Sequence, residues 1–458
     1  MAPRLISAVG SNSETNPARQ VAIEDTEVSA VAYFSPCVND PQGLPSPLCQ
    51  TGRDAVATIE PSILSATFAE DPNAVLEVMR EDHPVTYSEG MQSWLISRYE
   101  DVERAFKDKA FTSDNYEWQL EPVHGRTVLQ MEGREHSLHR NLIAPAFRGS
   151  ELTAKFIPVI EANARELING FRTEGRVDFV TQFTIRFPIN VIVDMLGLDK
   201  SDHDRFQTWY HSIMAFLGNL TGDEALTADG LKTKDELEDY MMPIIADRRA
   251  NPGNDLLSTM CAAVIDGEQM TDAEIKAFVS LLLVAGGETT DKALANMMMN
   301  LIANPNQLAA VRTDRSLIDN AFAETLRHSP PVQMIMRQPA EDVEMHGVTI
   351  PAGSTVTCLI AGANRDPRKY ADPDTFDIFR SDLSVDRAFS GAANHTGFCL
   401  GRHFCIGAML AKTEVEIAAN QLLDAMDDIA FDGPPPTPVG VFTRAPKVMP
   451  LTFTPTGN

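Results

Sequence analysis

Residues 271–304 constrain the fold of this chain more than any other part of the sequence. Thr271 and Glu274 form a Thr-x-x-Glu capping box ahead of a long apolar run, and Pro305 ends the segment. At 1.5 Å per residue, a helix of this length measures roughly 50 Å and crosses a whole domain. Its centre, residues 278–287, is apolar all round. We therefore expect a helix buried on all sides in the core of a large domain.

The rest of the chain indicates one large domain behind an irregular N-terminal segment. Residues 1–58 are rich in Ser, Asn and Pro and predict an extended or mobile extension, in which residues 28–34 alternatively add a strand to the body. Helix-period segments dominate residues 59–458, without βαβ alternation or a fixed repeat. Short strand patterns fall at residues 85–87, 94–97, 343–350 and 355–360. The predicted class is mainly α with small β-sheets.

Charge and cysteine content exclude several classes of protein. A net charge of −26 argues against nucleic-acid binding and against adhesion to an anionic membrane. The six cysteines are too few and too scattered for a disulfide scaffold or a zinc site, which fits a reducing cytoplasm. The longest apolar stretch, residues 277–285, is far below the ~18 residues that span a bilayer, and no signal-peptide pattern begins the chain. We expect a cytoplasmic protein without a membrane anchor.

The centre of the long helix carries an unusual run, residues 285–290, which read Ala-Gly-Gly-Glu-Thr-Thr. Adjacent glycines cost roughly 1 kcal/mol each in a helix interior, and burying a carboxylate without partners is unfavourable. Thr289 can also bond back to the carbonyl one turn earlier. Two interpretations stay open. One is a site of close helix packing with locally satisfied polar groups; the other is a groove for a bound group, served by an acid and an alcohol that relay protons.

A second run places a thiol just ahead of a helix. Residues 398–407 read Phe-Cys-Leu-Gly-Arg-His-Phe-Cys-Ile-Gly, and residues 408–426 are rich in good helix formers. Cys405 therefore lies at a helix N-terminus, where backbone dipoles lower the pKa of a thiol. Gly401 and Gly407 let the backbone approach a flat group closely. The pattern fits a thiolate ligand of haem iron, or alternatively a buried free cysteine in a tight turn.

A third motif, Glu324-Thr-Leu-Arg327, sets an acid and a base three residues apart on one helix face. Taken alone, such a pair is typical of a solvated surface contact. The order of the three motifs nevertheless resembles the cytochrome P450 family. Residues 131–145, 330–337 and 364–380 agree with that resemblance, which covers about residues 60–455. It implies the cytochrome P450 fold, with a long central helix over a buried haem b (iron protoporphyrin IX).

The resemblance also assigns roles by position. Cys405 would be the axial ligand of the haem iron, and Glu288 and Thr289 would deliver protons to dioxygen. The other residues implied to contact the haem, several of them cationic donors suited to its propionates, are His136, Arg140, Ala285, Arg337, Phe398, Gly401, His403 and Gly407.

Two further features concern the support of the haem. Glu324, Arg327 and Arg380 would form an internal ion network beneath it, with a structural role. The family usually has glycine where this chain has Cys399. That residue offers a rival thiol, but only Cys405 has both the following glycine and the helix N-terminus, so Cys405 is the expected ligand.

The implied activity is that of a monooxygenase acting on a lipophilic small molecule, such as a terpenoid, steroid, fatty acid or polyketide. Residues expected by analogy to line an apolar substrate pocket are Tyr116, Trp118, Trp209, Met214, Phe216, Val332, Met334 and Phe442. A peroxide-driven peroxygenase and a non-catalytic haem sensor on the same fold are the alternatives. The intact Glu288-Thr289 pair favours dioxygen chemistry over both.

The sequence has no cluster of four cysteines and no Gly-x-Gly-x-x-Gly fingerprint between a strand and a helix. We therefore expect electrons from an external ferredoxin and its NAD(P)H-linked ferredoxin reductase, acting on a monomer. The bases that would form a local dock for an acidic partner are Arg134, His139, Arg148, Arg402 and Lys412. Each of them, considered singly, is better explained as an ordinary solvated charge.

Overall fold

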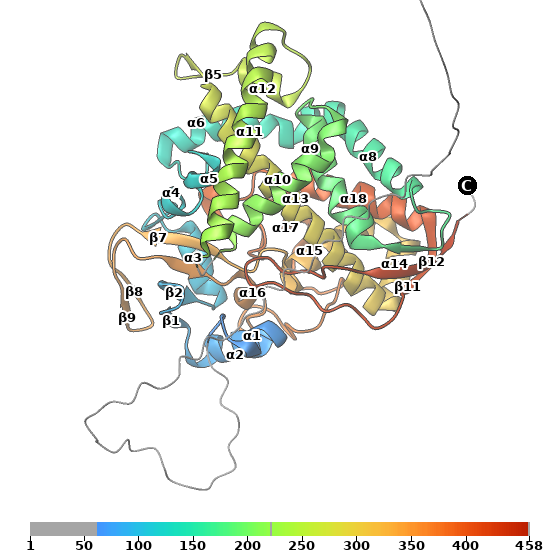
Figure 1. Ribbon diagram of the computed structural model, residues 1–458. Coiled ribbons are helices and arrows are strands. Elements are labelled where there is room, and N and C mark those ends of the chain that lie inside the picture. The colour runs from blue at the N-terminus through green and yellow to red at the C-terminus, as the bar shows by residue number, and fades with distance from the viewer. Residues whose placement is uncertain (1–61, 220–221, 457–458) are drawn as a thin grey trace, which may run out of the picture. The chain divides into compact units, whose positions relative to one another are not determined.

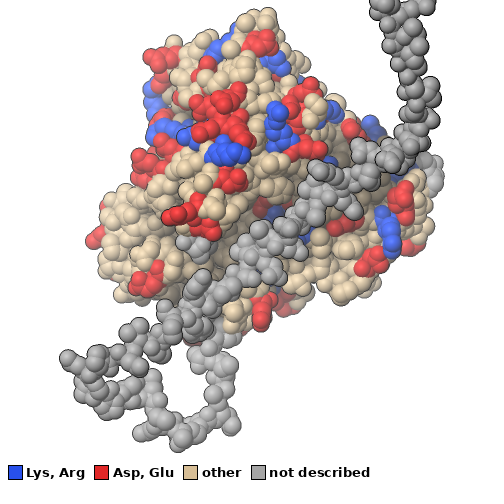
Figure 2. Space-filling view, viewed as in Figure 1, with Lys and Arg blue, Asp and Glu red and all other residues tan. Residues whose placement is uncertain are grey.

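The computed structural model describes residues 62–219 and 222–456, which belong to one compact unit, Ala57–Asn458 (Figure 1). The expected N-terminal extension at residues 1–58, with its alternative strand at residues 28–34, lies outside the described residues. No helix within the two described ranges is long and apolar enough to cross a membrane. On the face shown in Figure 2, acidic and basic side chains are interleaved over α11 (Glu224–Ala250), so this face carries no uniform charge.

The predicted long helix is α13 (Asp272–Ala303), which lies in the middle of the molecule (Figure 1). Thr271 is its N-cap, and the predicted capping box with Glu274 is present. The helices that pack against α13 include α9 (Arg186–Met195), α10 (His203–Leu217), α11, α15 (Ile318–His328) and α18 (Ala408–Ala425).

The expectation that the centre of this helix is buried on all sides is wrong along one stripe. Between residues 275 and 298, the positions that are not buried are Ala285, Gly286, Thr289 and Lys292. Ala285, Thr289 and Lys292 are spaced four and three residues apart, so they lie on one face of the helix. The apolar sequence did not reveal this stripe, because tertiary packing decides which part of the helix surface the surrounding elements cover.

The remaining helices complete the mainly α body, and most of them are short. They are α1 (Ala66–Glu70), α2 (Pro72–Asp82), α3 (Tyr99–Lys107), α4 (Tyr116–Gln119), α5 (Glu121–His124), α6 (Gly133–Ile143), α7 (Gly149–Glu151), α8 (Ile157–Asn169), α12 (Leu256–Cys261), α14 (Pro305–Thr313), α16 (Ile360–Ala363) and α17 (Val385–Ala388).

The largest sheet has five strands in the order β1-β2-β10-β7-β3. They are β1 (Val85–Ser88), β2 (Ser93–Ile96), β10 (Val356–Cys358), β7 (Ile335–Pro339) and β3 (Phe111–Thr112). β2 and β10 pair in parallel, with Leu95 opposite Thr357, and the other pairs are antiparallel. The strand pattern at residues 355–360 ends earlier than predicted, because Ile360 begins α16.

Three smaller sheets complete the β structure of the described residues. β11 (Met426–Phe431), β12 (Pro450–Pro455) and β4 (Arg176–Asp178) form a three-stranded sheet that the sequence did not predict. The pattern at residues 343–350 forms a hairpin, β8 (Val343–Met345) with β9 (Val348–Ile350). β5 (Val264–Ile265) and β6 (Glu268–Gln269) form a second hairpin. The predicted class, mainly α with small sheets, is confirmed.

Candidate active site

The stripe on α13 combines a hydroxyl group with close packing on the side toward α9. Thr289 Oγ1 donates a hydrogen bond to the Ala285 carbonyl at 2.7 Å, one turn back, as the sequence predicted. A Cβ atom added to Gly286 would lie 2.9 Å from Ile192 Cδ1, and one added to Gly287 would lie 3.0 Å from Ile189 Cγ1. The glycines therefore let α9 approach, while Ala285 and Thr289 remain accessible. The interpretation as a site of close helix packing describes the face of the helix toward α9. The interpretation as a groove for a bound group describes the accessible face.

Glu288 is held by two residues that the sequence analysis missed. Thr443 Oγ1 donates to Glu288 Oε1 at 2.7 Å, and Lys292 Nζ lies 2.7 Å from the same oxygen. Lys292 is one turn further along α13, so the Glu-to-Lys spacing of four residues could have indicated the pair. Thr443 lies far away in the sequence, and no local pattern marks it. The carboxylate is thereby paired with a cation at the end of the accessible stripe.

A second buried carboxyl group adjoins this cation. Thr184 Oγ1 donates to Asp291 Oδ1 at 2.6 Å, and Lys292 Nζ lies 3.6 Å from Asp291 Oδ2. Burial raises the pKa of Asp291 to about 6, against the lowering effect of Lys292 and of the Thr184 bond. Lys292 therefore bridges two acids, and only the side chain of Lys292 itself is partly exposed, at 20%.

The Cys405 loop is fixed by its backbone and by packed aromatic rings. Cys405 N donates to the Phe398 carbonyl at 2.9 Å, and the Phe398 ring packs at 6.1 Å from that of Phe322. Gly401 has a φ of +72°, and a Cβ atom there would lie 2.4 Å from the Phe106 carbonyl oxygen. Glycine at this position therefore serves the contact with α3. This contact alone explains why residue 401 is glycine, without the expected approach of the backbone to a flat group.

The expected lowering of the Cys405 pKa is wrong for the thiol in this structure. Burial raises the pKa of Cys405 to about 11, although the Gly407 N–H and the Arg140 guanidinium both act to lower it. Gly407 is the N-cap of α18, so the predicted helix N-terminus is present, but desolvation of the sulfur outweighs it. A metal cation bonded to the sulfur would hold the thiol deprotonated.

Cys399 occupies a backbone conformation that normally favours glycine. Its φ is +56°, in the left-handed region that costs non-glycine residues roughly 1–2 kcal/mol. Its N–H donates to the Thr396 carbonyl at 2.9 Å, which fixes the turn. Burial raises the pKa of the Cys399 thiol, and the nearby Arg337 guanidinium lowers it. The departure from the family pattern thus introduces strain without displacing Cys405 from the loop.

Four donors expected to hold the propionates gather around the Cys405 loop. Arg140 Nη2 donates to the Phe404 carbonyl at 2.5 Å, and the His136 and His403 rings lie 4.4 Å apart. Burial lowers the pKa of His136 to about 4, with further lowering by the charges of His403 and Arg140. Arg337 is 3% exposed and donates to the Met336 carbonyl at 2.8 Å.

The charge balance of these donors fits a group that carries carboxylates. Within residues 62–219 and 222–456, neither Arg140 nor Arg337 has a carboxylate within ion-pair distance, whereas His403 pairs with Glu132 at 3.2 Å. Arg337 is buried and Arg140 is partly buried, and cations in such surroundings without anionic partners are costly unless an anion binds beside them. A thiol, an accessible stripe on the central helix and two arginines without carboxylate partners together fit a haem with two propionates.

The three residues of the predicted ion network meet in the interior. Glu324 and Arg327 side chains are both 0% exposed, with Arg327 Nη2 2.6 Å from Glu324 Oε1. Arg380 Nε lies 3.1 Å from the same carboxylate, and the Asp377 N–H donates to it at 2.9 Å. This pair is thus not the solvated surface contact that the motif alone suggests.

The residues expected to line a substrate pocket separate into different environments. Met214 and Phe216 pack against a small apolar cluster of Val123, Ile213 and Val284, immediately before Ala285. Val332 forms a β-bridge with Thr443, beside Glu288. Met334 and Phe442 belong to another apolar cluster, with Leu95 and Leu359. Tyr116 is buried beside Arg337.

Two of the expected pocket residues lie elsewhere. Trp118 is 58% exposed at the surface. Trp209 packs against Phe206 and Tyr240 and donates its indole N–H to Glu236 at 3.0 Å, so it is a core residue between α10 and α11. A tryptophan looks the same in a sequence whether it faces a cavity, a neighbouring helix or solvent, which is why the sequence did not separate these two from pocket residues.

Most bases of the expected docking patch are paired with carboxylates. The pairs are Arg134–Asp266, His139–Glu274, Arg402–Glu132 and Lys412–Asp319. Arg148 is exposed. The patch therefore presents less free positive charge than its sequence suggests.

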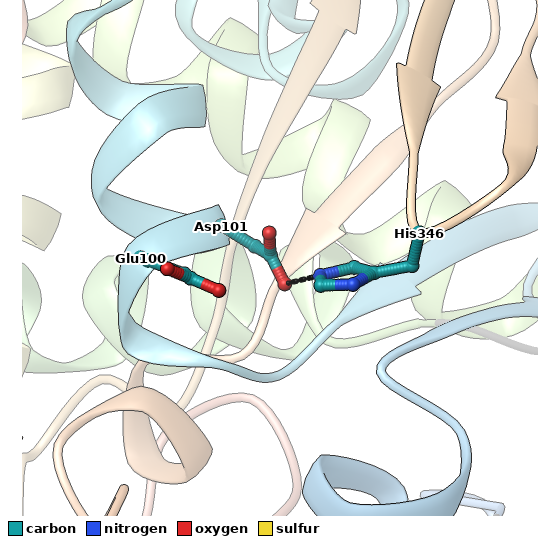
Figure 3. A group of neighbouring side chains, drawn as sticks. All are labelled: Glu100, Asp101 and His346. Carbon is teal, nitrogen blue, oxygen red and sulfur yellow. Dashed lines mark hydrogen bonds and ion pairs between the residues drawn. The ribbon is translucent and has the colours of Figure 1, made fainter. Parts of the chain in front are cut away.

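A separate group of side chains ties the β8–β9 hairpin to α3 (Figure 3). His346 Nε2 and Asp101 Oδ2 are 2.8 Å apart, and Glu100 is exposed beside them. Burial raises the pKa of Asp101, and the His346 bond opposes that rise. This contact holds the hairpin in place.

Fold and site together define a haem protein built around one long central helix. The family model "Cytochrome P450" matches residues 79–427, and the chain belongs to that family. It is therefore a cytochrome P450 monooxygenase of small molecules that carries haem b.

Relatives and solved structures agree along most of the chain. Pulcherriminic acid synthase of Bacillus subtilis is 39% identical over 86% of this chain and 97% of its own length. The monooxygenase PikC of Streptomyces venezuelae is 32% identical over 81% and 88%. The polyketide synthase cytochrome P450 PksS of Bacillus subtilis has a TM-score of 0.77 at 28% identity, covering 87% of this chain and 100% of that structure.

Proposed function

We propose that this monooxygenase oxidises a lipophilic small molecule, with electrons from an external ferredoxin and its NAD(P)H-linked reductase. Cys405 is assigned as the axial ligand, and Glu288 and Thr289 as the groups that supply protons. Bound haem supplies the activation of dioxygen. A steroid, terpenoid, fatty acid or polyketide remains the substrate class. The solved structure of CYP109E1 from Bacillus megaterium, 29% identical, is a complex with corticosterone, which supports a substrate of this kind.

The observation that carries the proton-supply role is the stripe of Ala285, Thr289 and Lys292 on an otherwise buried helix. The Lys292 side chain is partly exposed, and its Nζ contacts Oε1 of Glu288. Glu288 is the residue directly before Thr289 in the chain. A proton taken up at Lys292 can pass to the Glu288 carboxylate and then to Thr289 Oγ1. The Thr289 hydroxyl, bonded to the Ala285 carbonyl in this structure, can rotate to donate toward the accessible face.

The proposal is tested with the haem-loaded protein, surrogate ferredoxin partners and a substrate found by its spin-state shift. Thr289→Ala should consume NAD(P)H at a comparable rate but divert most electrons to hydrogen peroxide instead of product. Thr313→Ala is the matched control, because Thr313 Oγ1 makes the same bond to the Ala309 carbonyl at 2.9 Å on α14. Unchanged coupling in Thr289→Ala would contradict the role.

The same experiment separates the alternatives. Product formed with hydrogen peroxide and not with reduced ferredoxin would indicate a peroxygenase. Haem that is reduced and binds ligands without forming any product across the screened compounds would indicate a sensor. Glu288→Gln adds a second arm, since it keeps the size of the side chain while removing the charge that pairs with Lys292.

A further inference from the structure

Three side chains with metal-ligating atoms converge where the β8–β9 hairpin meets α3 (Figure 3). They are the carboxylates of Glu100 and Asp101, in the first turn of α3, and the imidazole of His346, at the tip of the hairpin. One ligand atom of each lies within 4.8 Å of the other two. His346 Nε2 and Asp101 Oδ2 are 2.8 Å apart, although the two residues are separated by 245 positions in the sequence. Tertiary folding therefore brings two oxygen ligands and one nitrogen ligand to a single place.

The Asp101 carboxylate at the centre of this group lacks a cation. Asp101 is 6% exposed, and its carboxylate lies between Glu100 and the His346 ring (Figure 3). Among residues 62–219 and 222–456, no lysine or arginine lies within ion-pair distance of either acid. Within the same ranges, Asp101 Oδ1 accepts no hydrogen bond, because the His346 contact uses Oδ2 alone. A buried carboxylate with an unused oxygen beside a second carboxylate is unfavourable unless a cation binds there.

The local backbone explains the two acids but not the histidine. Acidic residues are favoured in the first turn of a helix because of the helix dipole. His346 and Gly347 form the two-residue turn between the paired residues Met345 and Val348, with φ of +50° and +78°. Asparagine, aspartate and glycine are favoured in such a turn, so histidine carries a backbone cost. A role for the ring beside the acids of α3 accounts for a histidine at this position.

The donor set fits a transition metal better than calcium or magnesium. One imidazole nitrogen and two carboxylate oxygens are ligands that zinc accepts, with water in the fourth position. Calcium and magnesium take oxygen ligands, so the imidazole favours zinc and similar ions. Ligand atoms at about 2.0–2.2 Å from a tetrahedral zinc ion lie roughly 3.3 Å apart. The contact between His346 and Asp101 is already close to this separation, and the exposed Glu100 side chain can complete the site by rotation.

We propose that Glu100, Asp101 and His346 bind one divalent transition-metal ion of the zinc class. The ion replaces the hydrogen bond between His346 and Asp101, neutralises the two carboxylates and fixes the hairpin to α3. Its role is structural, because the opposite end of α3 contacts Gly401 in the Cys405 loop. The site is separate from the haem, and the inference does not depend on the proposed function.

The test uses the haem-loaded protein after dialysis against a chelator, with zinc chloride as the probe. Isothermal titration calorimetry should show one equivalent of Zn²⁺ bound with a micromolar dissociation constant, and zinc should raise the thermal unfolding midpoint. His346→Asn removes the imidazole but keeps a residue that the turn favours. Its affinity for zinc should fall by more than the about tenfold that loss of an outer-shell partner costs. His83→Asn is the matched control, because His83 follows α2 outside this group, and it should bind zinc as the wild type does.

A second variant tests the site without touching the hairpin. Glu100→Gln keeps the size of an exposed side chain and removes its charge, so it should weaken zinc binding with little effect on folding. Equal zinc affinity in the wild type and in His346→Asn, or a thermal midpoint of the wild type that zinc leaves unchanged, would overturn the assignment. Loss of binding in His83→Asn alone would place the ion elsewhere and overturn it as well. The haem spectrum should be the same with and without zinc, so a failure here leaves the proposed function standing.

Discussion

Replacing Arg327 with leucine should remove most of the stability of this protein. Both side chains of the Arg327–Glu324 pair are 0% exposed, and two hydrogen bonds of 2.7 and 2.6 Å join them. Breaking a buried pair costs about 3–5 kcal/mol, because the remaining charge stays buried, and Arg380, which stays 3.1 Å from the Glu324 carboxylate, places the loss at the lower end of that range. Arg327 also donates to the carbonyls of Asn364, Pro373 and Thr375, of which Thr375 keeps a bond from Arg380.

Each of the other two carbonyls adds a penalty of about 1–3 kcal/mol when unpaired. A loss of at least 5 kcal/mol is expected, against a total stability of about 5–15 kcal/mol for a typical domain. Urea unfolding followed by circular dichroism measures the loss, and the haem-to-protein ratio should fall with it.

An exposed ion pair supplies the control. Arg176 lies 3.0 Å from Asp432, with side chains 69% and 44% exposed, so Arg176→Leu should cost less than about 1 kcal/mol. The double variant of Arg327→Leu with Glu324→Leu removes both charges of the pair, leaves Arg380 its second partner Asp382 at 2.8 Å, and should be more stable than Arg327→Leu alone. Unfolding of Arg327→Leu at the same urea concentration as Arg176→Leu would show that the buried pair contributes no more than the exposed one.

Three further predictions concern single sites. Burial raises the pKa of Glu414 to about 8 from an ordinary value near 4.5. The folded state therefore holds a proton that the unfolded chain releases, and stability should fall by a few kcal/mol as pH rises from about 4.5 to 8, a loss that Glu414→Gln should lack in pH-dependent unfolding. Gly401→Ala should destabilise by at least about 2 kcal/mol and lower haem content, whereas Gly391→Ala, with nothing within 4 Å of its added methyl, should behave as wild type. Lys292→Met should slow product formation and shift its pH profile without changing the haem spectrum; an unaltered profile would mean that protons enter elsewhere.

The sequence predicted the elements whose causes are local. The capping box at Thr271 and the proline at 305 define α13 to within a residue at each end. The motif order identified the family, and the helix formers at residues 408–426 predicted α18 to within a residue. The ion pair of Glu324 and Arg327 was recognised, but it is energetically important only because it is buried. A four-residue motif does not show whether its side chains are buried.

What the sequence did not predict depends on contacts between distant segments. The bond from Thr443 to Glu288 joins residues 155 positions apart. Burial by surrounding elements raises the pKa of the Cys405 thiol against the effect of the helix end, a contribution that the local pattern does not contain. Trp209 was expected in a pocket, yet its indole N–H needed the partner that α11 provides. In each case the local pattern indicates the chemistry of the side chain but does not show which distant residues surround it.

The central claim is that Cys405 holds the haem iron as a thiolate. The most direct measurement is the Soret band of the dithionite-reduced, carbon monoxide-bound protein, recorded for the wild type, Cys405→Ala and Cys399→Gly. We predict the strongly red-shifted thiolate band in the wild type and in Cys399→Gly, and its loss in Cys405→Ala. A thiolate band that survives in Cys405→Ala and disappears in Cys399→Gly would assign the ligand to the other cysteine, and a wild type without haem would contradict the account as a whole.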